Sequence, residues 1–158
     1  MAATGYAFVA GGLIVTSSES VEIQRAAADV FRYVADLRNE PTWHVDIVSV
    51  PADTPAEPEV GRVVPVKFKP FMGKTDGTFT ALEVERGSRI VYQADFAGLQ
   101  PVITYQVESA GAGARFTRAV EMQPHGFAKL MTPMMKMMVP KRNRLFVQNL
   151  KRALEDAA

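Results

Sequence analysis

The sequence has no cysteine among its 158 residues. This absence excludes disulfide frameworks, thiolate nucleophiles and cysteine-ligated zinc sites, and it is consistent with the cytoplasmic location that we expect. The chain also lacks a strong charge of either sign, since its formal net charge is +1. Nothing in the charge balance therefore indicates a nucleic-acid partner, and we predict none. The length suits one domain.

A long hydrophobic run is missing as well. The most apolar segment, Tyr6 to Val15, is too short to span a bilayer as a helix. No charged residue precedes Glu19, so the basic start of a signal peptide is absent, and no clean cleavage site follows. We therefore expect residues 1–17 to form an apolar N-terminal extension, either loosely attached or folded as a hairpin at Gly11-Gly12, and residues 18–156 to form the domain.

Sequence signatures of common enzyme classes are also absent. The chain contains no G-x-S-x-G, Walker or dinucleotide-binding motif. It has two histidines, His44 and His125, and His44-Val45-Asp46 is the only compact set of candidate metal ligands. A metal site needs further nitrogen or carboxylate ligands, so we predict neither a metal nor another cofactor.

The residues that are present first predict a strand and a helix. Val21 and Ile23 alternate with polar residues, which indicates a short strand with one buried face. Apolar residues then recur at helical spacing over 27–37, and Pro41 ends that pattern. A short helix or turn over 43–47 and a strand near 48–52 should follow.

Five strand-like runs come next in the sequence. They cover 62–69, 75–85, 89–97, 102–108 and 115–123. The short turns between them require antiparallel neighbours, so we predict a meander. Within each run, apolar residues alternate with polar ones, and the alternation predicts which side chains point inward.

One of the predicted inward residues is charged. Arg118 shares a face with Phe116 and Val120, and a buried guanidinium without a partner is very costly. Arg118 must therefore be paired, lie near a strand end, reach solvent along its aliphatic stem, or face a polar group of a ligand. Arg142 raises the same question on the last helix.

The last segment, 126–156, is predicted to be helical. Its apolar stripe includes Phe127, Met131, Met135 and Met138, and flexible thioether chains fill irregular apolar spaces. Pro133 and Pro140 fall on the opposite side of the helical wheel, where they would curve the helix around the sheet; alternatively, one helix ends at Pro140 and another starts. A meander covered by one long helix is an α+β arrangement.

The order of these elements and several motifs resemble a known superfamily. The run SVEIQRAAADVFRYVADLRNEPTWHVDIVSV (Ser20 to Val50) is similar to the opening of the SRPBCC (START-like) superfamily, particularly its polyketide cyclase/dehydrase-like bacterial members. LEVERGSRIVYQ, AGARFTRAVEM and the ending LKRALED resemble later parts of the same pattern. The resemblance implies a helix-grip fold, in which a curved antiparallel sheet of six to seven strands wraps around a long C-terminal helix, with one or two short helices after the first strand. It also implies a cavity between sheet and helix.

Members of this superfamily carry lipids, sterols and hormones, cyclise polyketides, or act as protein-binding modules. We expect an apolar small molecule or lipid to bind in the cavity. The candidate ligand-binding residues are Trp43, Phe68, Tyr92, Phe96, Tyr105, Phe116, Arg118, Met131, Met135, Met138 and Arg142. Two alternatives stay open. One is a cyclase- or dehydratase-type enzyme that uses the same cavity. The other is a protein- or membrane-docking module, because the apolar and basic run FAKLMTPMMKMMVPKRNR could contact an anionic bilayer transiently. No pattern indicates an oligomeric state.

Overall fold

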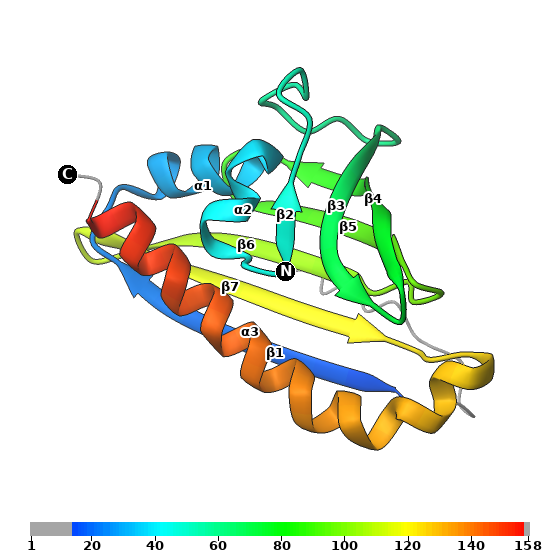
Figure 1. Ribbon diagram of the computed structural model, residues 1–158. Helices are drawn as coiled ribbons and strands as arrows, with labels where there is room; N and C mark the ends of the chain where they lie inside the picture. Colours follow the sequence, from blue (N-terminus) through cyan, green and yellow to red (C-terminus); the bar gives the residue numbers. More distant parts are fainter. Residues whose placement is uncertain (1–13, 157–158) are drawn as a thin grey trace.

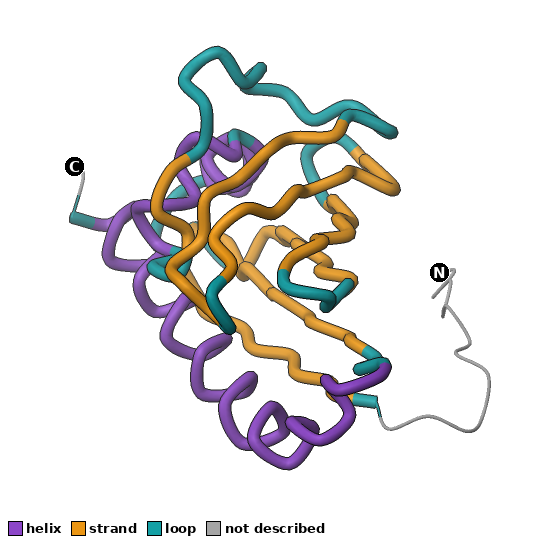
Figure 2. The backbone as a smooth tube through the Cα atoms, turned by 45° about the vertical axis from the view of Figure 1, so that its right-hand side comes forward, coloured by secondary structure: helices purple, strands orange, loops and turns teal. Residues whose placement is uncertain are grey.

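The computed structural model describes residues 14–156. Seven antiparallel strands form one sheet in the order β1-β7-β6-β5-β4-β3-β2. The strands are β1 (Val15–Ile23), β2 (Ile47–Ser49), β3 (Val63–Phe71), β4 (Lys74–Glu85), β5 (Arg89–Phe96), β6 (Val102–Ala110) and β7 (Gly113–Met122). The sheet curls strongly, and one long helix crosses its open side (Figures 1 and 2). This arrangement confirms the predicted α+β helix-grip fold.

The first strand begins earlier than the sequence pattern indicates. β1 pairs with β7 along its whole length, from Val15 opposite Met122 to Ile23 opposite Ala114. The strand therefore includes three residues of the segment predicted as an extension. Its middle, residues 16–20, is polar and shows no apolar alternation, because this edge strand has no buried side chain there: three residues are exposed and two are half-buried. The hairpin predicted at residues 11–12 lies outside the described residues.

The inward-facing side chains follow the predicted alternation. In β3, Val64, Val66 and Phe68 are buried and their neighbours are exposed. The same alternation continues through β6 and β7. Register shifts interrupt the pairing of β3 with β4 and of β4 with β5. Such irregularities bend a sheet and increase its twist, which closes the concave face around the interior.

Three short helical segments follow β1. They are α1 (Ala27–Ala35), the 3₁₀ helix η1 (Leu37–Asn39) and α2 (Glu40–Trp43). α1 ends before the predicted Leu37 because Asp36 adopts an extended backbone and its side chain accepts a hydrogen bond from the Arg38 amide at 3.1 Å. α2 begins three residues before the predicted 43–47 and shares only Trp43 with it, and Pro41 occupies its first turn, where a missing N–H is tolerated.

The C-terminal segment consists of two helices. A 3₁₀ helix, η2 (Gly126–Met131), precedes α3 (Thr132–Glu155), which continues through Pro140. The alternative of a break at Pro140 is therefore wrong, and Pro133 lies in the first turn of α3 instead of its interior. The side chain of Phe127 is 86% exposed, so it is not part of the buried stripe. The reason is that a 3₁₀ helix has three residues per turn, and residues of η2 therefore do not fall on the same face as the buried residues of α3.

α3 packs against the β1–β7 edge of the sheet through two apolar clusters. Near its C-terminus, Phe146, Val147 and Leu150 join the main core beneath α1 and α2. Near its N-terminus, Met135 packs with Val15 and Met122 in a smaller cluster. In the part of the chain that the structure describes, no helix combines the length and apolar character needed to cross a membrane.

Candidate functional site

One half of the interior is filled by a packed aromatic cluster. Trp43 makes edge contacts with Tyr105 and Phe116, at ring-centroid distances of 5.5 and 5.9 Å. Tyr105 in turn contacts Tyr92 at 5.6 Å. These four predicted ligand-binding residues, Trp43, Tyr92, Tyr105 and Phe116, lie in the solid core and do not line the cavity described next. The short helices close this end of the sheet, and Trp43, contributed by α2, fills the space beneath them.

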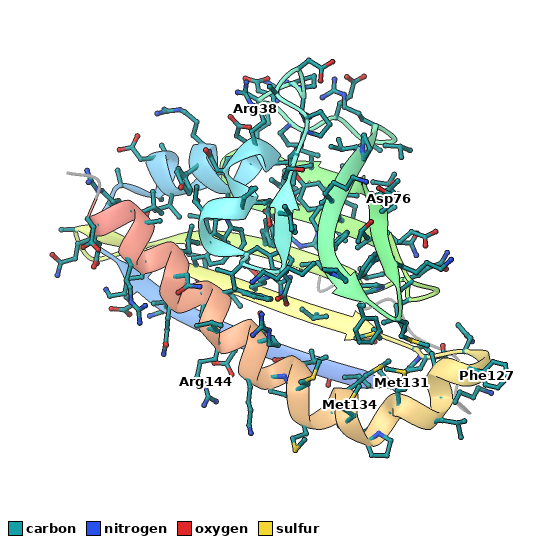
Figure 3. The ribbon with its side chains drawn as sticks, in the orientation of Figure 1. Arg38, Asp76, Phe127, Met131, Met134 and Arg144 are labelled. Carbon is teal, nitrogen blue, oxygen red and sulfur yellow. The ribbon has the colours of Figure 1, made fainter. Side chains whose placement is uncertain are left out.

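The other half of the interior contains a cavity of about 480 Å³. It lies between the first half of α3 and strands β3 to β7, in the stretch between the two clusters that hold α3. Six predicted residues line it: Phe68, Phe96, Arg118, Met135, Met138 and Arg142. Phe68 and Phe96 stack with their ring centroids 4.2 Å apart. Met131, the remaining predicted residue, packs beside the smaller cluster and is not part of the lining. Met131 and Met134 lie near the start of α3 (Figure 3).

Two tight turns position the aromatic side chains at this end of the sheet. The β3–β4 turn contains Met72 and Gly73 at φ 51° and 74°, and the turn after β5 contains Ala97 and Gly98 at φ 53° and 78°. Consecutive left-handed residues are typical of two-residue hairpin turns, and glycine adopts this conformation without steric cost. Each turn follows directly after a phenylalanine of the cavity wall, which is Phe71 or Phe96.

An ion pair borders the cavity. Two of the three guanidinium nitrogens of Arg142, Nε and Nη2, donate hydrogen bonds to the Asp46 carboxylate, and the Nε–Oδ2 distance is 3.2 Å. Each of the two side chains is 36% exposed. The carboxylate of the His44-Val45-Asp46 sequence is thus bound by Arg142. Within residues 14–156, no group of three potential metal-ligating side chains is positioned to hold an ion.

Arg118 lies deeper in the same cavity wall and is only 4% exposed. Its Nη1 donates to Asn143 Oδ1 at 2.9 Å. The Asn143 amide donates to the Arg118 carbonyl at 2.9 Å and to Ser17 Oγ at 3.0 Å, which fixes the orientation of that amide. The guanidinium carbons of Arg118 and Arg142 lie 5.2 and 5.4 Å from the ring centroid of Phe146. Asn143, on α3, was not identified from the sequence as a site residue.

A buried carboxyl group, also missed by the sequence analysis, connects the aromatic cluster to the cavity. Glu40 is 1% exposed and accepts a hydrogen bond from the Tyr105 hydroxyl at 2.8 Å. Its other oxygen, Oε2, lies 3.4 Å from Nδ1 of His44, and neither atom has another partner. His44 lines the cavity. The sequence placed Glu40 in a loop before Pro41, where a carboxylate is normally exposed, so no local signal marked it.

Burial determines the protonation of this pair. Burial raises the pKa of Glu40 to about 8, although the Tyr105 hydrogen bond and the Arg118 charge oppose the rise. Burial also lowers the pKa of His44 well below its usual value, and the charges of Arg118 and Arg142 add to that effect. At pH 7 both groups are therefore mainly neutral. A proton on Glu40 Oε2 then faces the unprotonated Nδ1 of His44 across 3.4 Å, which is longer than an ordinary hydrogen bond, and the proton of the imidazole is on Nε2.

The chain matches the family model described as "Polyketide cyclase / dehydrase and lipid transport" over residues 15–155. It therefore belongs to this family, within the wider SRPBCC (START-like) superfamily. Among curated proteins, none matches the sequence.

Solved structures share the fold at low sequence identity. DynU16, a protein of the dynemicin biosynthetic locus, is 18% identical with a TM-score of 0.63; the match covers 90% of this chain but only 48% of DynU16. Ara h 8.0201 is 17% identical with a TM-score of 0.66, and the match covers 90% of this chain and 99% of that protein. A START superfamily protein from Mycobacterium smegmatis is 14% identical with a TM-score of 0.66, over 90% and 99% of the two chains. Likeness at this identity shows the fold alone.

The raised pKa of Glu40 predicts how stability depends on pH. The folded protein retains this proton up to about pH 8, whereas the unfolded chain loses it near 4.5. The free energy of unfolding should therefore fall as pH rises between these values. The lowered pKa of His44 acts in the opposite direction, mainly below pH 6.5, so the effect of Glu40 dominates between pH 6.5 and 8. We expect a net decrease in the free energy of unfolding of about 1 kcal/mol over that range.

Urea unfolding of Glu40→Gln at several pH values tests this expectation. Glutamine reproduces the protonated carboxyl, because its oxygen can accept from Tyr105 and its amide can donate to His44. The variant should lose the dependence between pH 6.5 and 8 and exceed the wild type in stability at pH 8. Glu108→Gln, which changes an exposed carboxyl, should keep the wild-type slope. An unchanged slope in Glu40→Gln would show that another group causes the pH dependence, and a wild type without the decrease would show that Glu40 is ionised in the folded protein at neutral pH.

Proposed function

We propose that this protein binds and transfers an apolar small molecule or lipid in the cavity beneath α3. The observation that carries the proposal is the cavity itself, about 480 Å³, which lies beside the core cluster of the described residues. Ligand sites of drug-sized molecules span about 300–1,000 Å³ and have apolar walls with a few polar groups. Phe68, Phe96 and Met135 supply the apolar wall, and Arg118 and His44 supply the polar groups.

The methionines of α3 support a ligand of irregular shape. Met134, Met135 and Met138 line the cavity from the helix side. Unbranched thioether chains change rotamer easily and adapt to different apolar partners. The opposite wall, formed by stacked Phe68 and Phe96, is by comparison rigid and flat. One adaptable wall facing one rigid wall suits a ligand with an extended apolar portion.

Filling the cavity from the sheet side tests the proposal. Ala94 is on β5 and lines the cavity, whereas Ala81 is on the neighbouring strand β4 and belongs to the packed core. Ala94→Phe should keep its stability, because the new ring enters existing space, and it should weaken binding of the neutral dye N-phenylnaphthylamine at least tenfold. Fluorescence titration measures the affinity, and urea unfolding measures the stability.

Ala81→Phe is the matched control for the cavity-filling variant. The same ring has no space in the packed half, so this variant should lose about 1–3 kcal/mol of stability. Its folded fraction should bind the dye as the wild type does. Unchanged dye binding by Ala94→Phe would show that the cavity is not the binding site and would overturn the proposed function.

A second candidate function, turnover of the cyclase or dehydratase type, is favoured by the Tyr105–Glu40–His44 chain. With Glu40 protonated, the Nε2–H of His44 can donate a hydrogen bond to a carbonyl oxygen in the cavity, and it can transfer that proton if Nδ1 takes up the proton of Glu40 in the same step, which leaves Glu40 ionised. His44→Gln removes the acid but keeps a polar side chain. If the protein is an enzyme of this type, the rate at which His44→Gln forms product from a polyketide-like substrate should fall at least a hundredfold, while its affinity for the substrate stays the same. Binding without any product in the wild type would exclude this candidate.

Contact with an anionic membrane surface is favoured by exposed side chains around η2. We call Phe127, Leu130 and Met137 the η2 surface; their exposed fractions are 86, 80 and 60%. The sequence has no acidic residue between Glu121 and Glu155. Within the described residues, the exposed Lys129, Lys136 and Lys141 form no ion pair, so their charge is available to anionic lipid headgroups.

The η2 surface is also close to the cavity. Met134 and Met138, which line the cavity, are on the same part of α3 as Met137. Phe127, Met131 and Met134 lie together at the end of the molecule where α3 begins (Figure 3). A bilayer bound at the η2 surface would therefore lie beside the cavity wall, which would shorten the path of an apolar ligand through water.

Vesicle flotation tests the membrane contact. We expect the protein to float with phosphatidylcholine vesicles that contain phosphatidylglycerol and not with pure phosphatidylcholine, and the bound fraction to fall as salt rises. The double variant Phe127→Asp, Leu130→Asp should bind at least tenfold more weakly. Val48→Asp, Val60→Asp, which changes exposed apolar residues elsewhere, is the control and should bind as the wild type does. Equal flotation with neutral and anionic vesicles would contradict the proposal.

A further inference from the structure

The charges around the cavity do not balance. Its lining contains three cationic side chains, Lys69, Arg118 and Arg142, and one carboxylate, Asp46. Asp46 is already paired with Arg142. Lys69 is exposed to solvent, which reduces the cost of its charge. The uncompensated charge inside the protein is therefore that of Arg118.

Arg118 has no carboxylate partner within residues 14–156. Its one hydrogen bond is to the neutral Asn143 side chain, and its Nε is buried without any partner. The nearest buried carboxyl, Glu40, binds Tyr105 and is mainly protonated at neutral pH, so it does not supply a negative charge. The ring of Phe146 contributes only a weak attraction to the cation.

A buried cation without a counterion is strongly unfavourable, and such groups in proteins are normally paired. Asn143 holds the guanidinium in place from one side, through the bond to Nη1, and its own amide is fixed by two acceptors. The Nε of Arg118 is buried and has no hydrogen-bond partner among the described residues. A guanidinium group carries several N–H donors in one plane, and a pair of them matches the two oxygens of a carboxylate.

We propose that the ligand is an anionic amphiphile, with a carboxylate bound by Arg118 and an apolar portion against Phe68, Phe96 and Met135. This inference rests on the proposed ligand-binding function and narrows it to one class of molecule. Arg118 lies at the inner wall beside the packed aromatic half, so the charged end enters the cavity first and the apolar portion extends along α3.

Three probes that differ only at one end test the proposal on the full chain at pH 7. They are dodecanoate, methyl dodecanoate and dodecanol, each measured by displacement of N-phenylnaphthylamine from the delipidated protein. We expect dodecanoate to bind at least tenfold more tightly than the ester and the alcohol. In Arg118→Met, which keeps an unbranched apolar side chain, dodecanoate affinity should fall at least tenfold while the ester and the alcohol bind as before.

Arg115→Met is the matched control, since it removes a cation on the same strand as Arg118 that is exposed to water and lies outside the cavity lining. It should keep the preference for dodecanoate and change the affinity less than threefold. If the wild type binds the acid, the ester and the alcohol equally, the proposal of an anionic ligand is wrong, whereas the proposal that the cavity binds an apolar ligand is retained. If neither the dye nor any probe binds the wild type, the proposed function itself fails. The comparison of probes on the wild type needs no variant, so a poorly folded Arg118→Met does not prevent the test.

Discussion

The contact between α3 and the β1–β7 edge of the sheet is the constraint on which the interior depends. A single helix cannot follow a strongly curled sheet along its full length, so it touches the sheet where the separation is smallest. Here that contact consists of two clusters, one around Leu150 and one around Met135. The space between sheet and helix is filled beneath α1 and α2, where Trp43 enters it, and remains open beside Phe68 and Phe96.

The polar residues of the interior lie where the packed half meets the open half. Glu40 and Tyr105 are on the packed side, His44 and Arg118 line the cavity, and Asn143 connects α3 to Arg118. Buried polar groups are costly unless they are satisfied, and several here are not. Among the residues that carry these unpartnered atoms, His44 and Arg118 line the cavity, whereas Trp43 and Tyr92 lie in the packed half.

The fold itself places few limits on which ligand this is. The structures that share it are under 25% identical to this chain, and one belongs to a much longer protein. A shared scaffold provides a concave sheet and a covering helix, while the side chains that face the cavity determine the chemistry. In this chain those side chains combine an aromatic wall, a methionine-rich helix face and one buried cation.

Most of the fold could be predicted from the sequence because local patterns carry it. Strict alternation in the strands identified the inward face, including Arg118, and short turns required an antiparallel meander. The sequence was less informative where polar residues form regular structure through tertiary pairing. β1 begins at Val15 although its middle is polar, since pairing with β7 stabilises it, and η2 is 3₁₀, so Phe127 leaves the buried stripe.

What the sequence by itself determined was the set of side chains that face the interior; only the tertiary structure decided which of them enclose space. Trp43, Tyr92, Tyr105 and Phe116 face inward as expected but pack together, because the short helices bring Trp43 over them. Phe68, Phe96 and Met135 face inward beneath an uncovered stretch and line the cavity. The alternation of apolar and polar residues along a strand indicates to which side of the sheet each side chain points. The presence of a cavity depends instead on the distances between elements that are far apart in the chain. Glu40 and Asn143 could not be identified as site residues from the sequence, because their hydrogen-bond partners, Tyr105 and Arg118, are distant from them in the chain.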